Sequence, residues 1–158
     1  MRTIPAAILA VLCVSVMAHA RQNRPEDSVQ IRGLFGGAAF FGAETHKAMG
    51  ASADFRLARG LRLGPEVIYH IGPGRDRDIT STLLVSYDFR RLKRVTPFIT
   101  GGVGLLHHME GQWSWNSSTI GGGGGVKVAI SRRLFVAGEV RAGWEPFGRA
   151  MGGLGYRF

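Results

Sequence analysis

The chain has 158 residues, enough for one ordinary domain. Of these residues, 24 are glycine. This content argues against a helical protein, because each interior glycine costs a helix about 1 kcal/mol relative to alanine. No Gly-x-y period runs through it, which excludes a collagen-like fold. The formal net charge of +9 raises the question of nucleic-acid binding, which the positions of the charges must answer.

The first 20 residues have the pattern of a secretory signal peptide. Arg2 supplies a positive start, residues 4–17 an apolar core, and Ala18-His19-Ala20 a small-x-small cleavage pattern. The run is too short to be a convincing membrane helix. Because the one cysteine, Cys13, lies within it, we expect an exported mature chain without disulfides. Residues 21–28 would form a short periplasmic segment before the folded domain, residues 29–158.

From Val29 onward, apolar and polar residues alternate in eight segments. A two-residue period is typical of a strand with one apolar and one polar face. The alternation is cleanest in the second, third, fourth and seventh segments, and glycine blurs it in the others. We expect strands at Val29–Phe41, Met49–Ala58, Leu61–Ile71, Ile79–Arg90, Val95–His108, Ile120–Ile130, Leu134–Glu145 and Arg149–Phe158.

The connections between these strands are of two kinds. Three are short and basic, namely Arg59-Gly60, Arg91–Arg94 and Ser131–Arg133. The others are more varied, namely Ala43–Lys47, Gly72–Arg77, Pro146-Phe147 and Met109–Ser118, which we expect to be the longest loop. The pattern predicts an up-and-down antiparallel sheet closed into a barrel. A soluble barrel would turn its apolar face inward around a ligand, whereas a membrane barrel would turn it outward.

The polar face favours the membrane barrel. It carries the charged residues Arg32, Asp54, Arg56, Arg62, Glu66, Asp88, Lys127, Glu139, Arg141 and Arg157. A narrow eight-stranded interior can be filled by small residues and paired charges, and a closed barrel satisfies its backbone hydrogen bonds in lipid. Aromatic residues near strand ends match interfacial girdles, namely Phe41, Tyr69, Tyr87, Phe89, Trp144, Tyr156 and Phe158. The fold class we predict is all-β, an eight-stranded antiparallel up-and-down transmembrane β-barrel.

Several motifs resemble the small eight-stranded outer-membrane β-barrel proteins of Gram-negative bacteria, including the outer membrane protein A and outer membrane protein W families. They are the strand from Pro97 to Leu105, the segments Val126-Lys127-Val128 and Glu139-Val140-Arg141, and the ending Gly155-Tyr156-Arg157-Phe158. The resemblance implies location in the bacterial outer membrane, contact with its lipid and lipopolysaccharide, and an assembly signal at Tyr156 and Phe158 read by the barrel assembly machinery. It does not fix an activity.

Other motifs give no sharper function. Gly121–Gly125 lacks the Lys-Ser/Thr pair of a phosphate loop. Adjacent His107 and His108 point to opposite faces of a strand, and with His46 and Glu110 they show no recurring ligand spacing, so we predict no metal site. The basic turns fit membrane phosphates better than nucleic acid. Candidate residues for a serine hydrolase, which carry no recognised motif, are Ser114, Ser117, Ser118, His107, His108 and Glu110.

We therefore expect a non-enzymatic barrel without cofactors, structural or porin-like, whose lumen is mostly plugged. The plug would be an ion-pair network of Asp54, Arg56, Arg62, Glu66, Asp88, Lys127, Glu139, Arg141 and Arg157. Two alternatives stay open. One is a surface recognition barrel that uses Trp113 and Trp115, which could equally anchor the barrel at the membrane interface, and the other is a soluble periplasmic lipid-binding barrel. The sequence identifies no natural solute, surface partner or oligomeric state.

Overall fold

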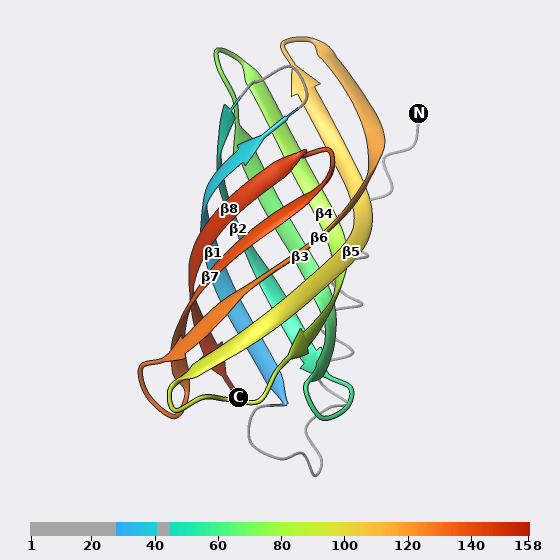
Figure 1. Cartoon of the computed structure of the whole chain (residues 1–158). Coiled ribbons are helices and arrows are strands. Elements are labelled where there is room, and N and C mark those ends of the chain that lie inside the picture. The colour runs from blue at the N-terminus through green and yellow to red at the C-terminus, as the bar shows by residue number, and fades with distance from the viewer. Residues whose placement is uncertain (1–27, 41–44) are drawn as a thin grey trace.

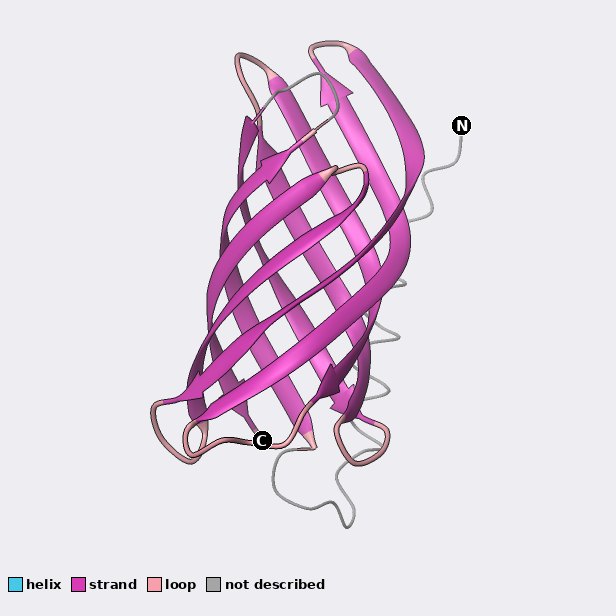
Figure 2. Cartoon of the chain, in the orientation of Figure 1, coloured by secondary structure: helices cyan, strands magenta, loops and turns pink. Residues whose placement is uncertain are grey.

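A computed structural model describes residues 28–40 and 45–158, which form a closed antiparallel barrel of eight strands (Figure 1). The strands are β1 Val29–Ala39, β2 Thr45–Arg56, β3 Leu61–Ile71, β4 Asp76–Asp88, β5 Val95–Glu110, β6 Trp113–Ala129, β7 Leu134–Trp144 and β8 Gly148–Arg157. Each strand pairs with its neighbours in sequence, and β1 pairs with β8 to close the sheet (Figure 2). This confirms the predicted fold class. Among the described residues, no helix is long and apolar enough to cross a membrane.

We call the two ends of the barrel the proximal end and the distal end. The proximal end holds the end of β8 and the β2–β3, β4–β5 and β6–β7 turns (Figure 1). The distal end holds the end of β1, the start of β2, and the β3–β4, β5–β6 and β7–β8 connections. At the distal end the β5–β6 hairpin rises above the β7–β8 hairpin, since β5 and β6 have 16 and 17 residues and β7 and β8 only 11 and 10.

The prediction of a long loop at Met109–Ser118 is wrong. β5 continues to Glu110 and β6 begins at Trp113, so the connection is the two-residue turn Gly111-Gln112. Gly111 adopts a positive φ of 60°, a conformation that glycine accepts without strain. Residues 113–116 are all exposed, so neither face of this strand needed apolar side chains. The alternation that identifies a strand is therefore missing there.

Two other connections differ from the prediction. β2 begins at Thr45 rather than Met49, and β4 begins at Asp76 rather than Ile79, so the predicted connections Ala43–Lys47 and Gly72–Arg77 contain strand residues. The predicted signal peptide at 1–20, residues 21–27 of the predicted periplasmic segment and Phe41 lie outside the described residues.

The two faces of the sheet differ in polarity. Apolar side chains face outward and stay exposed, as Phe35 does at 67% and Val140 at 64%. The largest fully buried side chains include Arg32, Arg62 and Lys127, which point into the lumen. A soluble barrel would have the opposite arrangement, because its apolar face must leave water. The outward apolar face is the arrangement that a lipid environment requires.

Candidate functional site

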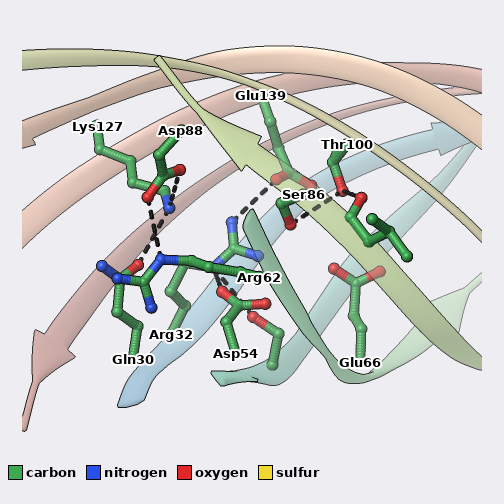
Figure 3. A network of polar contacts seen from close by, with 12 residues as sticks. Gln30, Arg32, Asp54, Arg62, Glu66, Ser86, Asp88, Thr100, Lys127 and Glu139 are labelled. Atoms are coloured by element: carbon green, nitrogen blue, oxygen red, sulfur yellow. Dashed lines mark hydrogen bonds and ion pairs between the residues drawn. The ribbon is translucent and has the colours of Figure 1, made fainter. Parts of the chain in front are cut away.

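The middle of the lumen is occupied by a network of six charged side chains, which we call the central network (Figure 3 shows part of it). Its members are Arg32 of β1, Asp54 of β2, Glu66 of β3, Glu139 and Arg141 of β7, and Arg149 of β8. All six are buried. Three guanidinium groups face three carboxylates, so the network is neutral as a whole. Neutrality matters because a buried charge without a partner costs several kcal/mol.

Glu139 links the two sides of the central network. Its Oε2 accepts a 3.1 Å hydrogen bond from Nη1 of Arg32, and its Oε1 lies 2.7 Å from Nη2 of Arg141. Arg32 also donates from Nε to Oγ of Ser52 at 3.0 Å and lies 3.5 Å from Oδ2 of Asp54. Removing the Glu139 carboxylate would therefore leave two guanidinium groups short of negative charge.

Glu66 ties opposite walls of the barrel together. Arg141 donates to it twice, from Nη1 to Oε1 and from Nη2 to Oε2, each at 3.1 Å. Arg149 donates to Oε1 as well. Because β3 and β7 are four strands apart in an eight-stranded barrel, the fork-to-fork pair of Glu66 and Arg141 crosses the lumen. Such a bidentate pair fixes geometry in addition to charge.

A second cluster surrounds Asp88 nearer the proximal end. Its Oδ2 accepts a 3.1 Å hydrogen bond from Nε of Arg62, and its Oδ1 accepts one of 2.7 Å from Nζ of Lys127. Lys127 also donates to Oε1 of Gln30 at 3.0 Å. These four side chains come from β4, β3, β6 and β1, so this cluster too spans the lumen (Figure 3).

Two buried aromatic rings support the cations of this region. Nζ of Lys127 lies 5.0 Å from the centre of the Phe98 ring, and the guanidinium of Arg157 lies 4.7 Å from that of Phe135, both within cation–π range. The ring of Phe135 has room in the lumen because its cross-strand partner on β8 is Gly155, which has no side chain. A Cβ added at Gly155 would lie 2.2 Å from Cζ of Phe135. The glycine therefore leaves the space that the ring fills.

The structure places seven of the nine predicted network residues in these two clusters, namely Asp54, Arg62, Glu66, Asp88, Lys127, Glu139 and Arg141. The other two, Arg56 and Arg157, line a cavity of about 600 Å³ at the proximal end. The sequence prediction missed Arg32, which it had placed on the polar face, and Arg149. Counting back from Arg157 in steps of two would have put Arg149 inside, but glycines at 152, 153 and 155 hide that period.

A smaller cavity, of about 30 Å³, adjoins Arg141 and Arg149 and has room for roughly one water molecule. Apolar side chains also occupy the lumen, where Leu34, Ile68 and Met151 pack together with Ala48. The inside of the barrel thus combines charged and apolar contacts.

On the outer face, aromatic side chains lie at both ends of the strands. At the proximal end, the rings of Tyr156 and Phe158 contact each other with centroids 4.8 Å apart, on either side of the inward Arg157. Tyr87 and Phe89 form a similar pair at 5.2 Å. Trp144 is exposed near the distal end, and Tyr69 is half-buried.

The residues weighed for a hydrolase do not assemble into a Ser-His-acid set among the described residues. Ser117 donates to Glu145, but the imidazole of His107 is hydrogen-bonded to Asn116 at 2.7 Å instead. Trp113 is 78% exposed at the tip of the β5–β6 hairpin. Trp115 is half-exposed and stacks on His108 with ring centroids 3.9 Å apart.

Comparison with solved structures identifies the fold as that of small outer-membrane barrels. The N-terminal β-barrel domain of Pseudomonas aeruginosa OprF matches with a TM-score of 0.68 at 15% identity, over 85% of this chain and 100% of that one. Neisserial surface protein A matches with a TM-score of 0.61 at 17% identity, over 85% of this chain and 98% of that one. Ail, the attachment invasion locus protein of Yersinia pestis, matches with a TM-score of 0.54 at 12% identity, over 86% of this chain and 100% of that one. No protein-family model and no curated protein sequence matches this chain.

Proposed function

We propose that this protein is a non-enzymatic β-barrel of the bacterial outer membrane with a structural or porin-like role and a lumen closed by its own side chains. The observation that carries the proposal is the inverted polarity of the barrel, with apolar residues outside and the neutral central network inside. The fold shared with OprF and neisserial surface protein A supports the outer-membrane location.

The orientation follows from the long β5–β6 hairpin, because the connections themselves are of similar length at the two ends. Short turns of such barrels normally face the periplasm and longer hairpins face outward. The proximal end, with its basic turns, would then be periplasmic, and the β5–β6 hairpin would project from the cell. The outward aromatic residues at the two ends would lie at the two lipid interfaces, where such rings are favoured.

The contacts that cross the lumen support its closure. Glu66 on β3 pairs with Arg141 on β7, and Asp88 on β4 pairs with Lys127 on β6. These pairs place charged side chains across the path that a hydrated solute would take. We expect conductance to be very low.

Location is tested by fractionation and by gel migration. The folded protein should co-sediment with outer membranes and should migrate differently in unheated and heated samples, because a folded barrel resists detergent until it is boiled. Recovery in the soluble periplasmic fraction, with one migration under both conditions, would contradict the proposal and favour the soluble lipid-binding barrel.

A second candidate function is surface recognition by the β5–β6 hairpin. The hairpin projects beyond the neighbouring β7–β8 hairpin, and Trp113 stands exposed near its tip (Figure 1). Ail, a protein named for attachment and invasion, has the same fold. Binding of whole cells to host-cell surfaces should fall on Trp113→Ser if this candidate is correct, and should be unchanged if Trp113 only anchors the barrel in lipid.

A further inference from the structure

Two histidines and two aspartates meet inside the barrel at its distal end, and we call them the distal His/Asp cluster. They are His46 of β2, Asp76 and Asp78 of β4, and His108 of β5. They are far apart in sequence, but the strand register gathers them, since Asp78 lies opposite His70 on one side and opposite His108 on the other. None of them belongs to the central network.

The donor atoms lie at the spacing of ligands around one metal ion. Single donor atoms of His46, Asp76 and Asp78 all fall within 4.8 Å of one another. Nε2 of His46 is 3.2 Å from Oδ2 of Asp76, and its Nδ1 is 3.2 Å from Oδ2 of Asp78. In a tetrahedral site with bonds of roughly 2.0–2.2 Å, neighbouring ligand atoms are about 3.3–3.6 Å apart. Only one nitrogen of His46 can bind a given ion, so one of these two contacts is a distance between ligands of that ion, and it is close to this value.

His108 approaches the same two carboxylates from the next strand. Its Nε2 lies 3.5 Å from Oδ1 of Asp76, and its Nδ1 contacts Oδ1 of Asp78. His108 lies outside the set of three whose donor atoms all fall within 4.8 Å of one another, and one of its nitrogens would add a fourth ligand from beside that set. Two imidazole nitrogens and two carboxylate oxygens suit a borderline ion such as Zn²⁺ better than Mg²⁺ or Ca²⁺, which prefer oxygen alone.

A second observation concerns the charge of the cluster. Asp78 is fully buried, and its two carboxylate oxygens face imidazole nitrogens, Oδ1 that of His108 and Oδ2 that of His46, rather than an arginine or a lysine. Buried carboxylates normally satisfy their oxygens with hydrogen bonds, cations or metal ions. With both imidazoles neutral, the cluster carries two negative charges, which one divalent ion would balance.

The surroundings hold the imidazole rings in place. His46 stacks on Phe40 with centroids 4.4 Å apart, and His108 stacks on Trp115 at 3.9 Å. A cavity of about 170 Å³, lined by these residues and by Glu145, adjoins the cluster. Orientation of ligand side chains by their neighbours is a regular feature of metal sites.

We propose that the distal His/Asp cluster binds one divalent transition-metal ion of the Zn²⁺ class at the outward mouth of the barrel. The proposal goes beyond the proposed function and does not depend on whether the lumen conducts. The bound ion would join β2, β4 and β5 at the level where the strands leave the closely packed part of the lumen.

The test is metal titration of the tag-free protein, folded in detergent and freed of metal with a chelator. Co²⁺ should bind one per chain and give the strong visible absorption of a tetrahedral site, and Zn²⁺ should displace it. Asp78→Asn should weaken binding by more than about 100-fold, and His108→Ala by more than about 10-fold. The difference between heated and unheated gel migration shows that each variant is folded, and His108→Ala suffices should Asp78→Asn fail to fold.

His107→Ala is the matched control, because His107 immediately precedes His108 on β5 and is hydrogen-bonded to Asn116, outside the cluster. Its affinity should equal that of the parent. Absence of stoichiometric Co²⁺ or Zn²⁺ binding would overturn the proposal and leave the cluster as a set of imidazole–carboxylate ion pairs. Equal loss in His107→Ala and His108→Ala, or tighter binding of Ca²⁺ than of Zn²⁺, would also overturn it.

Discussion

The central network and the distal His/Asp cluster both place carboxylates against nitrogen bases inside the same barrel, but they balance charge differently. In the central network the positive charge is fixed, because arginine keeps its proton in proteins. In the distal cluster the bases are histidines, which are readily neutral near pH 7. Both oxygens of Glu66 accept hydrogen bonds from arginine, whereas both oxygens of Asp78 face imidazole nitrogens. The first arrangement is balanced by fixed charges, and the second is suited to a further ion.

The largest effect should come from breaking the central network. Glu139→Ala removes the carboxylate shared by Arg32 and Arg141, so we expect the free energy of unfolding to fall by about 3–5 kcal/mol. Glu139→Gln keeps the shape and a hydrogen-bond acceptor and should cost less. Unfolding in urea, followed by gel migration, measures both.

Glu110→Ala is the control for this prediction, because Glu110 is exposed at the end of β5 and should change stability by less than about 0.5 kcal/mol. A Glu139→Ala protein as resistant to urea as its parent would show that the network is not structural.

A smaller effect should follow from filling the space under Phe135. The Cβ of Gly155→Ala would overlap the ring, and the shift that relieves the overlap should cost about 1–3 kcal/mol. Gly138→Ala adds the same methyl group where no atom lies within 4 Å, so its stability should be unchanged. If the two variants unfold at the same urea concentration, the ring is not held as described.

The smallest effect should distinguish the central network from the distal His/Asp cluster directly. In metal-free protein, Asp78→Asn removes a buried charge whose partners are imidazoles rather than arginines, so we expect a smaller loss of stability than at a carboxylate paired with arginine. Glu66→Gln, which leaves Arg141 and Arg149 facing a neutral group, should cost clearly more. Equal losses in urea unfolding would show that the distal cluster is as complete as the central network.

The sequence predicts the fold well where each strand has one polar and one apolar face. The alternation around Asp54, Arg62 and Glu139 correctly placed these residues inside the barrel. It failed at residues 113–116, because a hairpin exposed on both faces needs no alternation. It also failed at Arg149, where glycines obscure the period.

The distal His/Asp cluster could not be predicted from spacing. Its members lie at positions 46, 76, 78 and 108 on three strands, and only the register brings them together. His107 and His108 point to opposite faces of β5, as predicted, since His107 is hydrogen-bonded to Asn116 and His108 contacts Asp78. This excludes a site made from that pair and leaves His108 available to residues on other strands.

The central claim is that side chains close the lumen, and single-channel recording of the wild-type protein in a planar lipid bilayer tests it most directly. Because the central network crosses the lumen and the cluster of Leu34, Ile68, Met151 and Ala48 occupies part of it, we expect a conductance far below that of an open porin. A large and stable conductance would contradict this account, since it would require a continuous aqueous path through the positions that these side chains occupy.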